Sequence, residues 1–264
     1  MQSFQWDAKE YARSSGAQQT WAHELIAKLN LHGNERIADI GCGDGKVTAE
    51  LASHVPHGYV VGIDNSPEMI SLAQHQYPSE AFPNLSFTLG DARRLRYYNE
   101  FDVVFSNATL HWINDHLPVL RGMYGCLRHG GTALLQMGGR GNAAAVMESM
   151  QSLIKADAWR QFFHDFHFQY GFYGSEDYQE WLTQTGLQAV RVEIIPKDMT
   201  YPDAAGFAAW IRTTWLPYTE RIPRGDREKF ISHVVQNYLE RHPADMSGTI
   251  HVGMVRLEVE ARKR

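Results

Sequence analysis

The feature that most constrains the fold of this 264-residue chain is a regular alternation of short apolar segments with helical ones over residues 36–137. Strands that are separated by helices pair in parallel, and a parallel sheet is covered by helices on both faces. The pattern therefore predicts an α/β fold around a mostly parallel sheet. The segments that we predict as strands are Arg36–Ile40, Tyr59–Ile63, Leu85–Leu89, Phe101–Ser106 and Thr132–Met137.

The segments on either side of this core are predominantly helical. Apolar residues at helical spacing predict an amphipathic helix over Gln18–Leu29, and His251–Ala261 alternates as a final strand should. Residues 203–241 are too helical and too rich in aromatic residues to be a loop, so we interpret them as a lid over the strand ends, where open α/β folds bind ligands. We predict a single domain over residues 1–264, with a core at about 30–140 and 186–264 and helical lid elements at about 1–29, 141–185 and 203–241. Between these lie predicted helices at Ala143–Ile154 and Glu176–Thr185 and a sixth strand at Ala189–Ile195.

Composition excludes several classes of protein. The formal net charge is −5, and the longest basic run is Arg262-Lys263-Arg264, which argues against a nucleic-acid partner. No apolar run approaches the roughly 20 residues that span a bilayer, and residues 1–13 do not resemble a signal peptide. The two cysteines, Cys42 and Cys126, do not form a disulfide framework. We expect a cytoplasmic protein that binds neither membrane nor nucleic acid.

Three polar signals follow the first three predicted strands. The first is a glycine-rich loop, Ile37-Ala38-Asp39-Ile40-Gly41-Cys42-Gly43-Asp44-Gly45, which comes between a strand and a helix. Asp64 ends the second strand, where its carboxylate can accept both ribose hydroxyl protons. Asp91-Ala92 follows the third strand, where a carboxylate and a backbone N–H can contact an adenine edge. Together they predict a nucleoside-containing cofactor.

Two details of the loop favour S-adenosylmethionine over a dinucleotide. The dinucleotide fingerprint is Gly-x-Gly-x-x-Gly, and its third glycine falls here on Lys46. Asp39 lies two residues before the first glycine, where a carboxylate would repel a pyrophosphate. The same carboxylate suits the α-ammonium group of S-adenosylmethionine, directly or through water.

These motifs, taken together, resemble those of class I methyltransferases. The matching segments are Asp39–Gly45, Gly62–Ser66, Gly90–Ala92 and Phe101–Asn107. The resemblance implies a Rossmann-like sheet of seven strands with the last strand antiparallel, S-adenosyl-L-methionine as cofactor and S-adenosyl-L-homocysteine as product. It also implies the residues that contact the cofactor: Asp39 and Gly41 at the methionine portion, with Cys42 and Gly43 in the same cofactor-binding loop, Asp64 at the ribose, Asn65, Asp91 and Ala92 at the adenine, and Asn107 through its backbone at the amino group. Tyr11, near the N-terminus, is a candidate to close over the cofactor carboxylate.

A narrower resemblance concerns the methyl acceptor. Ser106–Trp112, followed by Asp115-His116, is similar to the corresponding segment of trans-aconitate methyltransferases. Juvenile hormone acid methyltransferases have a similar Leu-His-Trp there, and Tyr11–Gln18 resembles their N-terminal segment. Both groups form methyl esters, so the resemblance implies a small carboxylic acid as the acceptor.

Few catalytic groups are needed for this chemistry, because a carboxylate is already ionised near neutral pH. The resemblance places Gln18 and Trp112 as the donors that orient the carboxylate through an amide and an indole N–H. His111 is a candidate general base if the acceptor carries a proton, and otherwise lines the pocket. Trp112 can also be a packing aromatic, and Gln18 a solvated helix residue.

Other functions remain as alternatives. Methylation of nitrogen, sulfur or carbon on another small metabolite uses the same fold. A non-catalytic module that binds S-adenosylmethionine would keep Asp39, Asp64 and Asp91. Enzymes that methylate exocyclic base nitrogens commonly have Asn/Asp-Pro-Pro-Tyr where this chain has Ser106–Thr109, which argues against a base substrate. His164-Asp165-Phe166-His167 lacks a third ligand at a recognisable spacing, so we predict no metal site.

Overall fold

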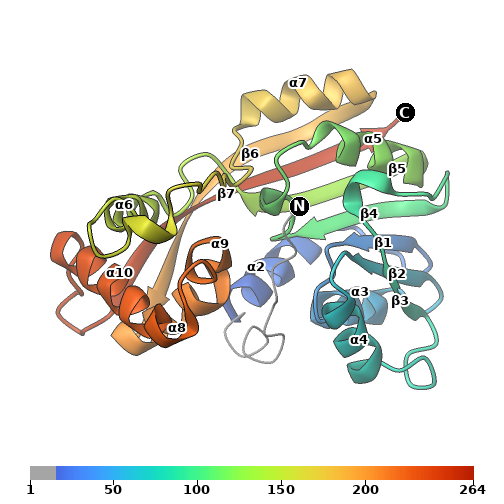
Figure 1. Ribbon diagram of the computed structural model, residues 1–264. Coiled ribbons are helices and arrows are strands. Elements are labelled where there is room, and N and C mark those ends of the chain that lie inside the picture. The colour runs from blue at the N-terminus through green and yellow to red at the C-terminus, as the bar shows by residue number, and fades with distance from the viewer. Residues whose placement is uncertain (1–15) are drawn as a thin grey trace. The chain divides into compact units, whose positions relative to one another are not determined.

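The computed structural model of the protein describes residues 16–264, with side chains from Trp21 onward (Figure 1). These residues form two compact units. The sheet unit comprises the described residues up to Arg140, then Tyr170–Ile195 and Arg256–Arg264. The helical unit comprises Gly141–Gln169 and Pro196–Val255. The single-domain organisation that we inferred from the sequence stays a prediction.

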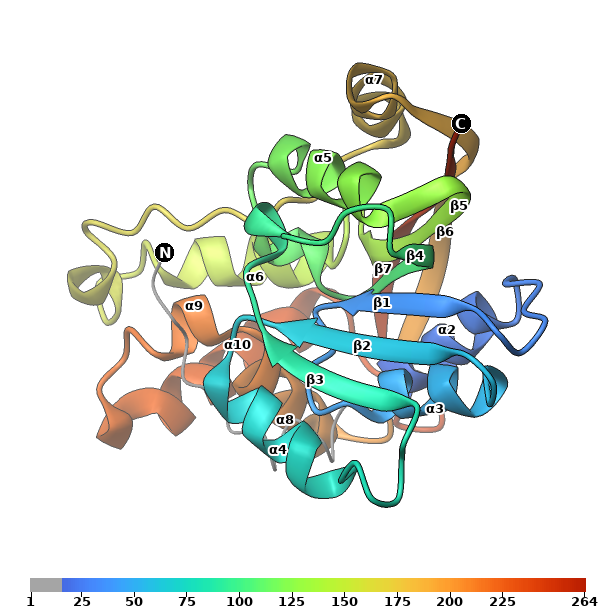
Figure 2. The same cartoon turned by 90° about the vertical axis from the view of Figure 1, so that its right-hand side faces the viewer.

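A seven-stranded sheet organises the sheet unit, in the order β3-β2-β1-β4-β5-β7-β6 (Figure 2). The pairs from β3 to β5 are parallel, and β7 runs antiparallel to β5. This confirms the predicted α/β fold with a mostly parallel sheet. Its strands are β1 (Arg36–Ile40), β2 (Tyr59–Asp64), β3 (Leu85–Leu89), β4 (Phe101–Asn107), β5 (Leu127–Gly138), β6 (Leu187–Tyr201) and β7 (Ile250–Lys263).

Helices cover both faces of the sheet, as predicted. Leu120 of α5 and Leu182 of α7 belong to the apolar core on one face, and Leu25 of α2 and Leu51 of α3 to the core on the other. Figure 1 shows α5 and α7 above the sheet and α2, α3 and α4 below it. The helices and 3-10 turns of this unit are α2 (Gly16–Ile26), α3 (Lys46–His54), α4 (Pro67–Gln76), η1 (Ala92–Arg94), η2 (Leu110–Trp112), α5 (Leu117–Cys126) and α7 (Ser175–Thr185).

An aromatic core holds the helical unit together. The Trp210 and Trp215 rings meet edge to face with their centroids 5.7 Å apart, and Trp159 contacts Phe230 at 5.1 Å in the same way. Such pairs stabilise a core beyond the area that they bury. The elements of this unit are α6 (Ala144–Leu153), η3 (Arg160–Phe162), α8 (Ala204–Thr214), α9 (Leu216–Thr219), η4 (Arg224–Asp226) and α10 (Arg227–Arg241), with the adjoining ends of β6 and β7.

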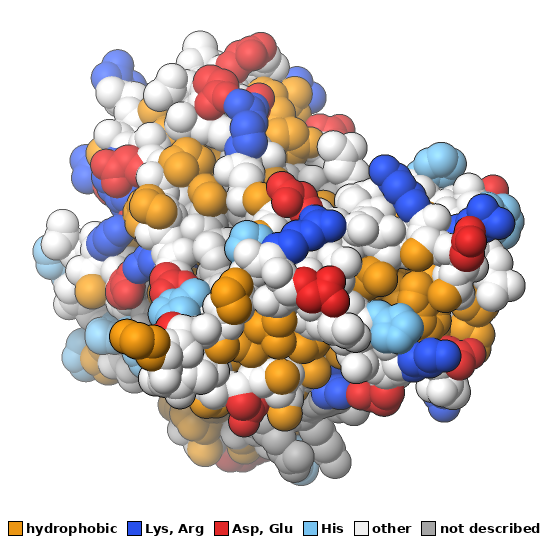
Figure 3. Space-filling model, turned by 90° about the vertical axis from the view of Figure 1, so that its left-hand side faces the viewer, with side chains coloured by type: hydrophobic (Ala, Val, Ile, Leu, Met, Phe, Trp, Pro, Cys, Tyr) orange, Lys and Arg blue, Asp and Glu red, His pale blue; other side chains and the backbone are white. Residues whose placement is uncertain are grey.

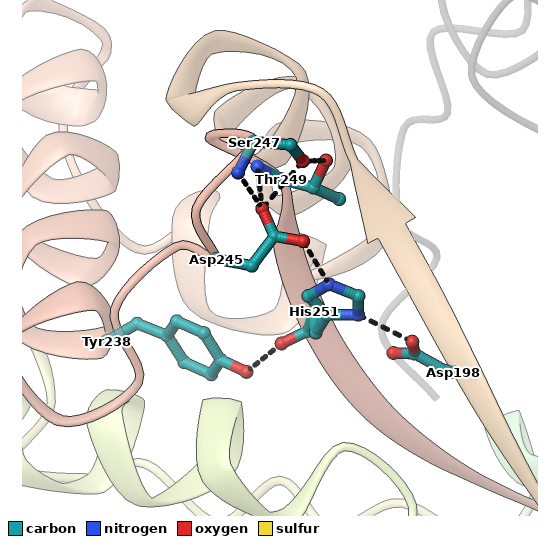
Figure 4. A network of polar contacts seen from close by, with 6 residues as sticks. All are labelled: Asp198, Tyr238, Asp245, Ser247, Thr249 and His251. Atoms are coloured by element: carbon teal, nitrogen blue, oxygen red, sulfur yellow. Dashed lines mark hydrogen bonds and ion pairs between the residues drawn. The ribbon is translucent and has the colours of Figure 1, made fainter.

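A polar network fixes the turn that leads from α10 into β7 (Figure 4). Asp245 accepts hydrogen bonds from the backbone N–H groups of Ser247 and Thr249 at 2.8 and 2.9 Å. His251 lies between Asp198 of β6 and Asp245, with nitrogen–oxygen distances of 2.6 and 3.2 Å. The two carboxylates raise the pKa of His251. The network therefore ties the turn to both strands within the helical unit.

Two helices differ from the sequence-based expectation in more than their bounds. Helix α5 received no predicted bounds, because Gly122 and Gly125 depress the helix propensity of its segment, whereas Pro118 lies in the first turn, where proline is tolerated. Helix α7, which we expected in the lid, belongs to the sheet unit. The reason is that Tyr178 and Leu182 of this helix are buried in the core of the sheet.

The surface carries charges of both signs. Acidic and basic side chains are interspersed on the face shown in Figure 3 instead of gathering by sign. Among the described residues, no helix is long and apolar enough to span a membrane.

Candidate active site

The carboxyl ends of four neighbouring strands lie together at one edge of the sheet. Ile40 of β1 pairs with Ile63 of β2, and Asp64 pairs with Leu89 of β3. On the other side of β1, the end of β4 is Asn107, which pairs with Gln136 of β5. This register brings together the loops that carry the predicted cofactor-binding residues, as expected for an open α/β sheet.

The glycine-rich loop between β1 and α3 needs glycine at its turns. Gly41, Gly43 and Gly45 have φ values of +78°, +53° and +84°, in the left-handed region that side chains disfavour. A Cβ atom on Gly41 would come within 2.1 Å of the Thr109 side chain, whereas one on Gly43 would meet nothing within 4 Å. The loop is therefore packed closely at Gly41 and open at Gly43, where a ligand can approach the backbone.

Asp39 is a buried carboxylate with an unusual pKa. Only 2% of the residue is exposed, and its Oδ2 accepts a hydrogen bond of 2.7 Å from the Thr48 hydroxyl. Burial raises its pKa to about 7, the Thr48 bond opposes this shift, and repulsion from Asp64 adds to it. A bound cation would favour the ionised form. Cys42 is also buried, and burial raises the pKa of its thiol, so it is not a reactive thiolate.

Asp64 is held by the backbone at the end of β2. Its two carboxylate oxygens accept hydrogen bonds from the N–H groups of Gly43, at 3.0 Å, and Ser66, at 2.9 Å. Burial raises its pKa, and these bonds oppose the shift. The neighbouring Asn65 is exposed. The fixed carboxylate retains lone pairs for further donors, such as a pair of hydroxyl groups.

Asp91 follows β3 and is engaged by Arg93. Its carboxylate accepts from the Arg93 backbone at the start of η1 and from the Arg93 guanidinium, with an Nη2–Oδ2 distance of 2.5 Å. The guanidinium hydrogen bond lowers the pKa of Asp91. Ala92, the next residue, is half-buried. Sequence reasoning missed Arg93 as the partner that fixes this carboxylate.

The segment after β4 is joined to the glycine-rich loop. The Thr109 hydroxyl lies 3.0 Å from the Gly41 carbonyl and 3.1 Å from that of Asn107, and can donate to either. Ala108, between them, has a φ of +54°, an uncommon value for a residue with a side chain. Strained backbone of this kind is often found at functional sites. Sequence reasoning missed Thr109, because its partner Gly41 is 68 residues away.

His111 and Trp112 of η2 lie in an aromatic cluster. The Trp112 ring meets Tyr170 edge to face at 5.2 Å, and the centroids of His111 and Phe172 are 5.9 Å apart. The Gly138 N–H points at Nδ1 of His111, with a nitrogen–nitrogen distance of 3.3 Å. Nε2 therefore carries the proton of the neutral ring. Burial, helped by the charge of Arg256, lowers the pKa of His111 to about 3.

His116 is a buried residue that is hydrogen-bonded to both ends of this turn. It is 1% exposed, and its Nε2 lies 2.8 Å from each of the carbonyl oxygens of Leu110 and Ile113. Its Nδ1 lies 2.7 Å from the Tyr178 hydroxyl of α7. Because carbonyl oxygens only accept, Nε2 must carry the proton and Nδ1 accepts from Tyr178. His116 thus fixes both sides of the segment that presents His111 and Trp112.

Arg256 is a buried cation that sequence reasoning missed. It is 3% exposed and lies opposite Gly138 in the β5–β7 ladder. Its guanidinium carbon is 4.1 Å from the ring centroid of Trp21 on α2, a cation–π contact. No local signal in the sequence indicates the burial of Arg256, because it takes the polar positions of the last strand's alternation together with Glu258 and Glu260.

Two predicted site residues cannot be placed fully. The backbone of Gln18 belongs to α2, one turn before Trp21, but its side chain is outside the described residues. Tyr11 is outside them altogether. No group of three or more potential metal ligands occurs from residue 16 onward. His164 and Asp165 form an exposed pair at 2.8 Å.

Comparison with known proteins identifies the family. Residues 31–186 match the methyltransferase domain family, and because they are more than half of the chain, the protein belongs to it. It is an S-adenosylmethionine-dependent class I methyltransferase. The chain is 27% identical, over 98% of both sequences, to the trans-aconitate 2-methyltransferases of Shigella flexneri serotype 5b and Escherichia coli K12.

Solved structures show the same fold. A phosphoethanolamine N-methyltransferase of Haemonchus contortus, in complex with S-adenosylhomocysteine, has a TM-score of 0.62 at 18% identity over 97% of this chain and 56% of that one. Geranyl diphosphate C-methyltransferase of Streptomyces coelicolor A3(2) has a TM-score of 0.58 at 11% identity over 97% and 84%. The acceptors in these titles differ, so the fold by itself leaves the acceptor open.

The site geometry fits the cofactor. The open backbone at Gly43 gives room for a ligand beside Asp64, whose carboxylate is held in place by two backbone N–H groups. Asp39 is a buried acid whose ionised form needs a cation. An ammonium group and a ribose diol satisfy these two requirements at neighbouring strand ends.

Proposed function

We propose that this methyltransferase transfers the methyl group to a carboxylate oxygen of a small organic acid. The observation that supports the proposal is the state of His111, the titratable group beside Trp112, whose pKa of about 3 and occupied Nδ1 leave it neutral. Amines, phenols and thiols must lose a proton on methylation, whereas a carboxylate is already ionised near neutral pH. The full-length similarity to trans-aconitate 2-methyltransferases supports the same acceptor class.

The cofactor supplies an electrophilic methyl group on a sulfonium. Asp39 would hold its ammonium group, Asp64 its ribose, and Asn65, Asp91 and Ala92 would lie at its adenine. The backbone of Gly41, Cys42, Gly43 and Asn107 would surround the methionine portion. The protein's own contribution is then to position the acceptor oxygen in line with the methyl group and to exclude water.

Two donors in η2 and α2 would hold the carboxylate. The indole N–H of Trp112 and the amide of Gln18 each donate to one oxygen and leave the other directed at the methyl group. The Nε2–H of His111 is a third neutral donor in the same turn. Neutral donors suit this reaction, because the negative charge of the carboxylate disappears as the ester forms. A cation beside the reacting oxygen would stabilise the ground state more than the transition state and so slow the reaction.

The test is incubation of the protein with methyl-labelled S-adenosylmethionine and a panel of acids, from tricarboxylates such as trans-aconitate to fatty and terpenoid acids. We expect a base-labile labelled product, as a methyl ester must be. Cofactor binding without transfer to any acid, together with transfer to an amine, thiol or carbon acceptor, would overturn the proposal.

Replacing Trp112 with phenylalanine tests the orienting role. The ring is largely kept, so packing against Tyr170 should survive, but the indole N–H is lost. We expect kcat/KM for the preferred acid to fall about tenfold to a hundredfold, as for the loss of one hydrogen bond to a charged group. Affinity for S-adenosylhomocysteine should stay near that of the wild type. Unchanged turnover would show that Trp112 is a packing residue.

The raised pKa of Asp39 predicts pH-dependent cofactor binding. Below its pKa of about 7 the carboxyl is protonated, so an ammonium ligand must displace that proton. We expect the affinity for S-adenosylhomocysteine to rise on the order of eightfold from pH 6 to pH 7.5, with proton release that is largest at the acidic end. Calorimetry in buffers of different ionisation enthalpy measures both. Asp39→Asn should bind more weakly and without this pH dependence, and an equally flat profile in the wild type would contradict the assignment.

A further inference from the structure

The position of Arg256 in the sheet separates it from the cofactor residues. The candidate cofactor residues follow β1, β2, β3 and β4, whereas β7 lies two strands beyond β4 in the sheet order. Neighbouring strands are about 4.8 Å apart, so Arg256 is roughly 10 Å across the sheet from the end of β4. Its pairing with Gly138 places it at the same carboxyl edge as the site. Gly138 in turn donates its N–H to His111, so this end of the β5–β7 pair adjoins the turn that carries Trp112.

The surroundings of Arg256 keep its guanidinium rigid and poorly hydrated. The residue is 3% exposed, and the Trp21 ring covers the flat face of the guanidinium at 4.1 Å. Trp21 covers one face of the guanidinium, and the N–H groups of an arginine lie in the plane of that group, which is the geometry in which arginine binds a carboxylate in a bidentate manner. The charge of Arg256 also helps to hold the nearby His111 in its neutral form.

We propose that Arg256 binds a second carboxylate of the acceptor, one that is not methylated. The proposal rests on the carboxylate O-methylation proposed above and makes the acceptor an acid with at least two carboxylates. A cation beside the oxygen that is methylated would be poorly placed, because the attraction between the cation and the carboxylate disappears as the ester forms. A spectator carboxylate keeps its charge throughout, so its attraction to Arg256 is equal in the ground and transition states and acts on KM rather than kcat.

Three other arginines are less buried than Arg256. Arg140 is paired with Glu176 and with Asp177, Arg212 is bidentate to Glu228, and Arg221 donates to the backbone carbonyl of Phe162. Arg256 is distinguished from these three by its burial and by its place at the carboxyl edge of the sheet.

The experiment compares two acceptors on two variants. The acceptors are the best polycarboxylic acid of the panel, with trans-aconitate as the first choice, and its analogue with a primary amide in place of one spectator carboxylate. We expect Arg256→Met to raise the KM for the acid about 30-fold or more, to leave kcat within about threefold, and to leave the amide analogue nearly unaffected. Arg256→Lys keeps the positive charge but loses the planar guanidinium that binds a carboxylate through two hydrogen bonds. It should recover part of the preference for the acid over its amide analogue.

Controls separate the possible explanations. Arg128→Met makes the same change of charge at the opposite end of β5, where Arg128 pairs with Asp102, and should leave the preference for the acid unchanged. Affinity for S-adenosylhomocysteine should be the same in Arg256→Met and the wild type. A loss of that affinity, or an equal loss of activity on both acceptors, would overturn the proposal.

Binding measured without turnover distinguishes this proposal from the one on which it rests. Titration of the acid into protein saturated with S-adenosylhomocysteine should give a dissociation constant that Arg256→Met raises about 30-fold or more. If no acid is methylated but this effect is seen, carboxylate O-methylation fails and the carboxylate site stands. If acids are methylated but Arg256→Met changes neither the dissociation constant nor the selectivity, the role of Arg256 fails and the methylation stands.

Discussion

Replacement of Gly41 with alanine should abolish measurable cofactor binding at micromolar concentrations. The new methyl group would lie 2.1 Å from both branches of the Thr109 side chain and 2.5 Å from its Cβ, so a rotation of Thr109 cannot relieve the overlap. The backbone at residue 41 also has a φ of +78°, which costs about 1–2 kcal/mol for a residue with a side chain. With the overlap added, we expect the free energy of unfolding to fall by about 2–4 kcal/mol.

The loss of binding follows from what Thr109 holds. Its hydroxyl bridges the carbonyl groups of Gly41 and Asn107, so pushing it away separates the loop after β1 from the segment after β4. We expect affinity for S-adenosylhomocysteine to fall at least about a hundredfold, which calorimetry measures directly. Gly130→Ala is the matched control, because its φ is +82° and an added Cβ meets nothing within 4 Å. Gly130→Ala should lose only the stability that a side chain costs at a positive φ, and it should bind S-adenosylhomocysteine as tightly as the wild type. Wild-type affinity in Gly41→Ala would contradict the packing argument.

The predicted features that the structure confirms are local ones. β1 and β3 have the predicted bounds, because each is a short run that buries apolar side chains, Ile37 and Ile40 in β1 and Leu85 and Phe87 in β3, and is followed directly by a turn. Helix α4 begins where Ser66 and Pro67 indicate, and the Ser66 hydroxyl accepts from the Met69 N–H. The loops after the strand ends lie together because the strands are parallel, which brings their carboxyl ends to one edge of the sheet.

The features that were missed depend on contacts between distant segments. Arg256 contacts Trp21 of α2 and pairs with Gly138 of β5, and no local pattern links the three. His116 entered the sequence analysis only as part of a family resemblance, and its burial depends on the approach of Tyr178 from α7, 62 residues away. β5 starts five residues before the predicted strand, because Leu127 pairs with Phe101 across a bulge that the sequence does not signal.

Replacement of His116 with leucine should cost about 3–4 kcal/mol of unfolding free energy and most of the activity. The side chain is buried and serves the Leu110 and Ile113 carbonyls and the Tyr178 hydroxyl, and leucine would leave all three without this partner. Because the two carbonyls flank Trp112, the turn should loosen, and kcat/KM for the acceptor should fall about tenfold or more. Affinity for S-adenosylhomocysteine should change little, since the residues at the strand ends are untouched.

Tyr178→Phe is the matched control for this substitution. It removes the hydroxyl that contacts Nδ1 but leaves Nε2 on both carbonyls, so we expect a loss of about 1–2 kcal/mol and nearly normal kcat/KM. The pH dependence gives a second test. Burial lowers the pKa of His116, so the unfolded chain binds the proton more readily and wild-type stability falls as the pH falls below about 6.5. In His116→Leu, the contribution of His116 to the slope of unfolding free energy against pH, up to about 1.4 kcal/mol per pH unit, should be absent. A slope equal to that of the wild type, with an undisturbed kcat/KM, would show that His116 merely fills space behind the turn.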